Sequence, residues 1–402
     1  MAHKTLIGGT AYSITGGRSM IGGTVYSISK GRTMINGTGY DISFGPAAYA
    51  MLYSDGDMIF QFGNEVTNGK TLSNNWTGFE TARYSGDSAV PWYTSRNNIR
   101  NIAIVDEIAP ISLAYWFSNA RNLVSTDLSL LKWDRITNMA YTYRNCHNLI
   151  GSPICGSKVT NMTRAYYYCY NLTGSPVCGN NVIDMAYAYI DCYNLTGSPV
   201  CGNKITNMAG AYSNCLNLIG SPVCGNNVIN MAYTYLNCYN ITGNPVCGNK
   251  VTDMSNTYRN CYNITGNPVC GNNVTNMTNA YIDCHNITGN PVCGNNVTSM
   301  SNAYANCYNL TGNPVCGNKV TNMAGTYQNC SNLTGNPVCG NNVTDMSNAY
   351  QSCYNLTGNP VCGNNVTSMS YTYRNCYNIT GSPVCGNNVE LMVTTYGNCY
   401  NL

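Results

Sequence analysis

Apolar and polar residues recur along most of this chain with a period of 23. Counting from Cys146 as position 1, the unit reads C-x-N-[LI]-x-G-[SN]-P-[VI]-C-G-x-x-[VI]-x-x-M-x-x-[AT]-Y-x-x. A fixed period of about 20 to 50 residues is the signature of a solenoid, in which each unit buries its apolar face only by stacking on its neighbours. The pattern therefore predicts an α/β repeat solenoid of about 12 coils over residues 111–402.

One side of each coil has the spacing of a helix. Met at position 17, Ala or Thr at 20, Tyr at 21 and the next Cys follow the i, i+3, i+4, i+7 pattern of one helical face, as in Met346, Ala349, Tyr350 and Cys353. Thr, Ser, Asn and Asp, which are favoured at helix N-caps, crowd positions 15 and 16 just before it. We therefore expect a helix or 3₁₀ turn on this side.

The other side of each coil runs between two glycines, at positions 6 and 11, which read as turns. The "SPVC" or "NPVC" between them is long enough for one brief strand, and its Pro cannot donate to a ladder, so the strand must begin after it. We expect a short parallel ladder here that advances by about 4.8 Å per coil.

The N-terminus carries a second period, of 14 residues. "KTLIGGTAYSITGG", "RSMIGGTVYSISKG" and "RTMINGTGYDISF" each hold two short alternating runs around Gly-Gly or Asn-Gly, which is a strong hairpin signal. Residues 1–45 should thus form three β-hairpins. Hairpins of this size have little core alone, so we expect them to attach to a partner or to oligomerise.

Residues 46–110 lie between the two repeats and should form a globular N-terminal cap. All four Trp and all five Phe of the chain precede the first Cys, and large aromatics suit an irregular core rather than a stacked coil. Within this segment "MLYSDGDMIFQFG" reads as a hairpin around Asp-Gly.

Composition narrows the function classes. Only 9% of the residues are charged and the formal net charge is +3, so there is no basic excess that would indicate nucleic-acid binding. No stretch approaches the roughly 18 consecutive apolar residues of a membrane span, and "MAHKTLIGGTAYSITGG" lacks the apolar run of a secretory signal. We expect no membrane insertion, and we expect any export to use another route.

Catalytic and cofactor chemistry has little support in the sequence. The chain has three His, scattered carboxylates and no phosphate-binding glycine motif, so we predict no enzyme activity and no cofactor. Asn at position 3, present in every unit, reads as structural, through hydrogen bonds from coil to coil or to a turn.

The 23 Cys form two ladders with a step of 23 residues. They could be a metal site, a set of disulfides or core filling. Metal sites favour closely spaced Cys pairs, which are missing here, and 23 thiols cannot all pair within one chain. Buried, reduced thiols are the favoured interpretation. Representative members are Cys146, Cys155, Cys169, Cys178, Cys339, Cys353 and Cys362.

Recognition is best sought where the copies disagree, at positions 19 and 22. One interpretation is that these positions are exposed to solvent and vary without functional constraint. The other is an extended surface rich in Tyr and Arg, the residue types favoured as recognition anchors. The candidate residues are Tyr141, Arg144, Arg164, Tyr167, Tyr187, Tyr233, Arg259, Tyr371 and Arg374.

The repeat resembles a known family. "ITNMAYTYRNCHNL" and the longer preceding unit "LAYWFSNARNLVSTDLSLLKWDRITNM" are similar to the core of BspA-like leucine-rich repeats, and the resemblance covers residues 100–402. This chain departs from the family in having Tyr for Phe at position 21, Cys at position 10 and Pro at position 8. The resemblance implies a surface adhesin, a class that often carries a signal peptide and an anchor.

The 14-residue modules resemble N-terminal repeats of tail-associated proteins of phages that infect gut Firmicutes. Two functions are therefore predicted. The first is a virion tail fibre or receptor-binding protein, assembled in the host cytoplasm, whose hairpins bind other virion proteins and whose solenoid meets a host surface protein or glycan. The second is an adhesin or matrix protein of the bacterial cell surface. Both are expected to be homo-oligomers.

Overall fold

The structure, a computed structural model, describes most of the chain. The described residues are 3–7, 10–14, 18–21, 24–27, 30–35, 38–43, 47–291, 293–314 and 316–402.

Each 14-residue repeat contains one antiparallel strand pair, as predicted. In the first pair His3 lies opposite Ile14 and Ile7 opposite Thr10. The second and third pairs have the same antiparallel arrangement. The six strands are β1 (His3–Ile7), β2 (Thr10–Ile14), β3 (Arg18–Ile21), β4 (Thr24–Ser27), β5 (Lys30–Ile35) and β6 (Thr38–Ser43). Their partners or oligomeric state remain a prediction.

A five-stranded mixed sheet follows, with strand order β11-β10-β8-β7-β9. Its strands are β7 (Ala48–Tyr53), β8 (Asp57–Phe62), β9 (Leu72–Thr77), β10 (Asn101–Ile104) and β11 (Ser125–Asp127). The predicted hairpin around Asp-Gly is confirmed, because β7 and β8 pair antiparallel and Gly56 turns the chain with φ 93°. Strand β10 pairs parallel with β8, and β11 pairs parallel with β10. Because β11 lies past residue 110, the sheet extends into the first long repeat unit.

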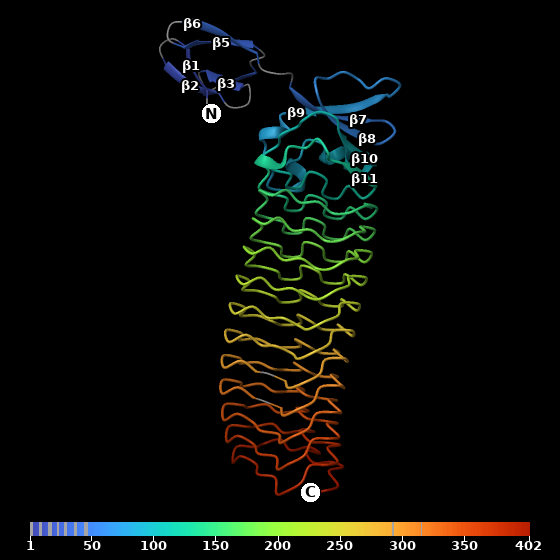
Figure 1. The fold of residues 1–402 in the computed structure, drawn as a ribbon, viewed down its shortest axis with the longest axis vertical. Helices are drawn as coiled ribbons and strands as arrows, with labels where there is room; N and C mark the ends of the chain where they lie inside the picture. Colours follow the sequence, from blue (N-terminus) through green and yellow to red (C-terminus); the bar gives the residue numbers. More distant parts are fainter. Residues whose placement is uncertain are drawn as a thin grey trace.

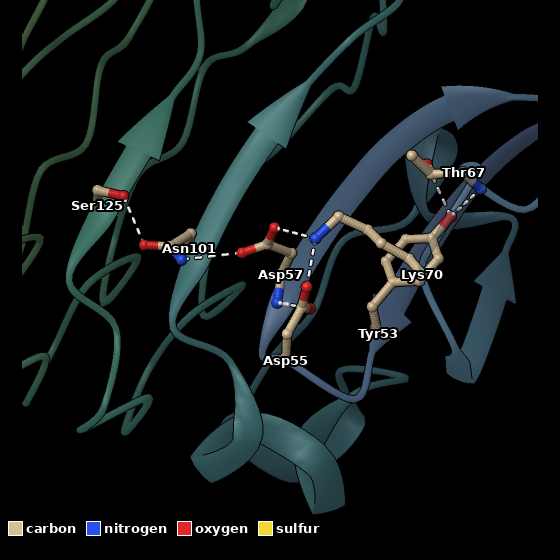
Figure 2. Close-up of polar contacts among 7 residues, drawn as sticks. All are labelled: Tyr53, Asp55, Asp57, Thr67, Lys70, Asn101 and Ser125. Atoms are coloured by element: carbon tan, nitrogen blue, oxygen red, sulfur yellow. Dashed lines mark hydrogen bonds and ion pairs between the residues drawn. The ribbon is translucent and has the colours of Figure 1, made fainter.

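Polar side chains connect these strands along one end of the sheet (Figure 2). Lys70 forms ion pairs with Asp55 and Asp57. Asp57 accepts a hydrogen bond from the Asn101 amide at 2.9 Å, and Asn101 accepts one from the Ser125 hydroxyl at 2.8 Å. The network therefore runs from β8 through β10 to β11, which joins the cap to the first coil.

Behind the sheet lies the aromatic core predicted from the position of the Trp and Phe residues. Phe60 stacks on Trp116 with ring centroids 5.4 Å apart, and Phe79 meets Trp116 edge-on at 5.5 Å. Four short 3₁₀ helices surround this region, none of which is long and apolar enough to cross a membrane. They are η1 (Phe79–Thr81), η2 (Asp87–Ala89), η3 (Tyr93–Asn98) and η4 (Trp133–Arg135).

The 23-residue coils stack one on another away from this sheet (Figure 1). Backbone N–H groups at positions 17, 19, 21 and 23 donate to carbonyls of the next coil. Met231 donates to Asp253 at 3.0 Å, and Tyr233 donates to Ser255 at 2.9 Å. The N–H groups between them close local turns instead, as in Thr234 N–H to Met231 C=O at 3.0 Å.

The predicted helix or 3₁₀ turn is therefore wrong, although the predicted buried face is right. Met346, Ala349, Tyr350 and Cys353 are all fully buried. The backbone is not helical because positions 19 and 23 have positive φ in every described coil, and a helix needs φ near −63°. Each such residue is the third of a four-residue turn, the place where a type II turn requires positive φ.

The polar side chain before the turns accepts a backbone hydrogen bond, as predicted, but it does so in a turn and not at the start of a helix. The side-chain oxygen of Asn230, at position 16, accepts the N–H of Ala232 at 2.9 Å. This is an Asx turn rather than a helix cap. Position 16 also carries the parallel pairing, since isolated bridges join successive coils there, as between Asn230 and Asp253.

Among the described residues, the strand predicted in the Pro-Val-Cys segment is missing from most coils. In the coils from Tyr166 to Tyr258, the Tyr at position 21 reaches across the coil to the residue at position 9. The Tyr235 hydroxyl donates to the Val223 carbonyl at 2.8 Å and accepts the Val223 N–H at 3.0 Å. These bonds satisfy backbone groups that a ladder would otherwise pair. Near the C-terminal end Val338, Val361 and Val384 form parallel bridges instead.

Inside the stack the same tyrosines form a continuous column. Successive rings from Tyr143 to Tyr396 lie 5.2 to 5.7 Å apart and nearly parallel. Phe117 begins this column, 5.6 Å from Tyr143, so the cap core and the coil core are continuous.

Candidate functional site

Four planar side chains at position 19 stack along the first coils. Tyr115 and Tyr141 lie 4.7 Å apart at an interplanar angle of 7°. The Arg164 guanidinium follows, 5.5 Å from the Tyr141 ring and 5.1 Å from the Tyr187 ring. The column ends on Gly210, where an added Cβ would lie 2.6 Å from the Tyr187 ring. A cation thus sits between two aromatic faces, with a glycine making room for the last ring.

These side chains stand on strained backbone. Tyr115, Tyr141, Arg164 and Tyr187 have φ of 64°, 61°, 53° and 58°. Left-handed backbone costs an L-residue about 1–2 kcal/mol, except Gly and, in part, Asn. Later coils carry mostly those two at position 19: Asn256, Asn279, Asn302, Gly325 and Asn348. Tyr and Arg in the first coils are therefore not the residues that the backbone prefers.

Position 22 supplies the neighbouring wall. Arg144 lies 3.7 Å from the Asp87 carboxylate of the cap, and its guanidinium lies 5.8 Å from the Tyr141 ring. Tyr167 is on the following coil, with its ring 5.9 Å from the Arg164 guanidinium. Tyr115, Tyr141, Arg144, Arg164 and Tyr167 enclose an open hollow of about 370 Å³. We name these five residues and Tyr187 the Tyr-Arg patch.

Hydrogen bonds and charge define the hollow further. An Arg164 Nη1–H donates to the Tyr141 hydroxyl at 2.6 Å. No carboxylate of the described residues lies within ion-pair distance of Arg164, so its charge is balanced only by ring faces. Burial raises the pKa of Tyr167 to about 12, which keeps this phenol protonated at neutral pH.

A second column, at position 23, borders the patch. Its Asn side chains hydrogen-bond from coil to coil, as in Asn237 to Asn214 at 2.6 Å and Asn145 to Asn119 at 2.6 Å. Tyr168 replaces Asn beside the patch, and its ring lies 3.9 Å from the Tyr167 ring. The repeat thus has a residue other than Asn at position 19, and at Tyr168 also at position 23, in the same few coils that carry Arg144 and Tyr167 at the variable position 22.

The structure brings five of the nine predicted recognition residues together in the Tyr-Arg patch. The other four lie on other coils. Tyr233 and Arg259 are exposed, and Tyr371 lies 5.6 Å below the Arg374 guanidinium. Sequence reasoning missed Tyr115, Tyr168 and Asp87; the first two had a signal, since both replace the residue expected at a repeat position.

Both Cys ladders consist of free thiols. At position 1 the thiol is buried and donates to the Tyr carbonyl of the preceding coil, as in Cys169 to Tyr143 and Cys353 to Tyr327, at 3.1 and 3.0 Å. At position 10 several thiols are only partly buried, and burial still raises the pKa of Cys155 and Cys178 to about 11. Such thiols are poor nucleophiles and suit a structural role. Cys146, Cys339 and Cys362 are likewise free and buried.

The remaining polar candidates have structural contacts. Asn240, at position 3, donates to the Leu216 carbonyl of the preceding coil at 3.0 Å, which confirms the predicted coil-to-coil role. His147 stacks on Tyr170 at 4.7 Å, and burial lowers the pKa of His147. Within the described ranges no three His, Cys, Asp or Glu side chains gather as a metal site would require.

One family model matches part of the chain. It is described as a Mycoplasma protein of unknown function, DUF285, and matches residues 275–384, about a quarter of the chain. No curated protein matches the chain.

Two solved structures are similar over most of the chain. One is a leucine-rich repeat protein from Eubacterium ventriosum, 10% identical, with a TM-score of 0.35, covering 88% of this chain and 92% of its own. The other is a leucine rich cell surface protein from Faecalibacterium prausnitzii, 13% identical, with a TM-score of 0.31, covering 84% of this chain and 96% of its own. None of these matches is described as a virion protein.

Proposed function

We propose that this chain is a binding protein of the bacterial cell surface, an adhesin or matrix component that contacts its partner through the Tyr-Arg patch. One observation carries the proposal. Residues that left-handed backbone disfavours occupy position 19 in consecutive coils and stack on one another, whereas most of the later coils carry Asn or Gly there. Strained backbone of this kind is concentrated at functional sites.

The surface location rests on the resemblance of the repeat to BspA-like adhesins. A virion protein, the other function predicted from the N-terminal hairpins, has no support among the comparisons. Immunogold labelling with an antibody to the coil stack separates the two, because an adhesin labels intact, uninfected cells. Label confined to purified phage particles would contradict the proposal.

The binding role is tested by returning the patch to residues that the repeat itself uses. The triple variant Tyr141→Asn, Arg164→Asn and Tyr187→Gly should retain the fold, since Asn and Gly tolerate positive φ. Its adhesion to host cells or extracellular matrix should fall to background. The matched control is Tyr233→Asn with Tyr371→Asn, which changes the same position outside the patch. Equal adhesion of both variants and the unaltered protein would refute the assignment.

A further inference from the structure

The hollow of the Tyr-Arg patch has the chemistry of an anion site. Arg144 and Arg164 both line it, from adjacent coils. Arg164 uses Nη1 for the Tyr141 hydroxyl and has no carboxylate partner among the described residues. Because a guanidinium has five N–H donors in a planar fork, donors remain for a planar anion.

Asp87 is a carboxylate of the cap that lies close to Arg144, and it does not neutralise Arg164. Its Oδ2 accepts the Asn119 amide at 2.6 Å and lies 3.7 Å from Arg144. Its Oδ1 is buried without a hydrogen-bond partner in the described part of the chain. Asp87 thus holds Arg144 at the rim and leaves the charge of Arg164 uncompensated.

We propose that the hollow binds the carboxylate of an acidic sugar, with Arg144 and Arg164 as the anion-binding residues and the tyrosines as its walls. This inference rests on the proposed function and names its ligand class. A volume of about 370 Å³ is at the small end of ligand sites and suits one or two sugar rings.

The surroundings favour a glycan over a protein partner. The hollow is lined by three tyrosines, whose phenol hydroxyls can bond to sugar hydroxyls. A protein partner would need a desolvated apolar area around its acidic side chain. Large exposed aliphatic residues of these coils, namely Val124, Leu130, Ile150 and Ile183, do not line the hollow.

The test is calorimetric titration of the full chain with a uronic-acid tetrasaccharide, a sialylated trisaccharide and the carboxyl-reduced tetrasaccharide. At least one acidic sugar should bind and the reduced one should not. Arg164→Asn and Arg144→Gln should each weaken binding tenfold or more, as should raising the salt concentration. Arg259→Gln, which changes position 22 outside the patch, is the matched control and should have no effect. Asp87→Asn should strengthen binding several-fold by removing a competing anion.

Equal binding of the acidic and reduced sugars, or equal loss in Arg144→Gln and Arg259→Gln, would overturn the inference. Binding of poly-glutamate but of no sugar would assign the site to an acidic peptide and overturn it too. If no acidic sugar binds while adhesion still depends on the patch, the glycan inference fails and the proposed function stands. If adhesion ignores the patch variants as well, both fail.

Discussion

The left-handed backbone at position 19 leads to a stability prediction that separates strain from ring contacts. Tyr233 is the best site, because it has φ 60°, is 45% exposed and has no stacked ring partner among the described residues. We compare Tyr233→Gly with Tyr233→Ala. Both variants lose the same ring, so the difference between them reports on the backbone.

The expected order of the two free energies of unfolding follows from the backbone φ at residue 233. Gly at ordinary φ is less stable than Ala by roughly 0.5–1 kcal/mol, because its unfolded chain is freer. At positive φ the Cβ of Ala costs about 1–2 kcal/mol, which exceeds that entropy. Tyr233→Gly should therefore have a free energy of unfolding about 0.5–1 kcal/mol higher than Tyr233→Ala. The control is Tyr239, at position 2, which lacks positive φ and where Ala should be the more stable.

Urea unfolding of the full chain, followed by far-UV circular dichroism, measures both pairs. Repeat proteins open locally, so hydrogen exchange at the amide of residue 233, which donates to Ser255, reports the same difference in the affected coil. If Ala is more stable than Gly at both positions, the backbone at position 19 is unstrained. Backbone strain would then give no reason to assign Tyr141, Arg164 and Tyr187 to binding.

Three further predictions follow from the coil interior. Tyr235→Phe removes two hydrogen bonds to Val223 and should lower the free energy of unfolding by about 1–3 kcal/mol, while Tyr239→Phe, measured by the same urea unfolding, should change it little; equal effects would contradict the cross-coil role. Burial raises the pKa of Cys155 and of Cys178 to about 11, so a thiol reagent at pH 8 should label these two thiols slowly in the native chain. After denaturation all 23 cysteines should be labelled quickly; rapid labelling of Cys155 and Cys178 in the native chain would refute this. Burial also raises the pKa of Asp191, at position 23, above its ordinary value of 3.8. The protonated carboxyl is therefore favoured in the folded chain. Its contribution to the free energy of unfolding is complete below pH 3.8 and declines as the pH rises through the folded-state pKa. Asp191→Asn should therefore be more stable than the unaltered protein at pH 7, and the difference should vanish in thermal unfolding near pH 3.

The repeat and its buried face could be read from the sequence, because Met, Tyr and Cys recur with one period. The backbone conformation of that buried face could not be read from the sequence, and the predicted helix was wrong. A row of tight turns that faces the core at Met346, Ala349, Tyr350 and Cys353 has the same apolar spacing as one helical face. The distinguishing signal was the frequent Asn or Gly at positions 19 and 23, which marks positive φ.

The site was partly predictable for a related reason. Variation at positions 19 and 22 identified Tyr141, Arg144, Arg164, Tyr167 and Tyr187, but variation alone could not separate them from Tyr233 or Arg259. The distinction needs the stacked order of the coils. Asp87 could not be found at all, because it comes from the irregular cap, whose contacts with the coils follow no repeat.

The same physics explains why the patch lies where it does. A stack of near-identical coils offers near-identical surfaces, so a distinct site requires coils that break the pattern. Breaking it at Met, at the Tyr of position 21 or at Cys would open the core, whereas the patch side chains at positions 19 and 22, and Tyr168 at position 23, are only partly buried. Replacements there cost only local strain, which the cross-coil hydrogen bonds of the same turns can hold in place. Tyr141 and Tyr187 show this directly: their N–H groups still donate to the next coil at 2.9 and 2.8 Å although their φ values are unfavourable. Because the backbone hydrogen bonds between coils persist with unfavourable residues at the turns, different side chains can be presented on the same stack of coils.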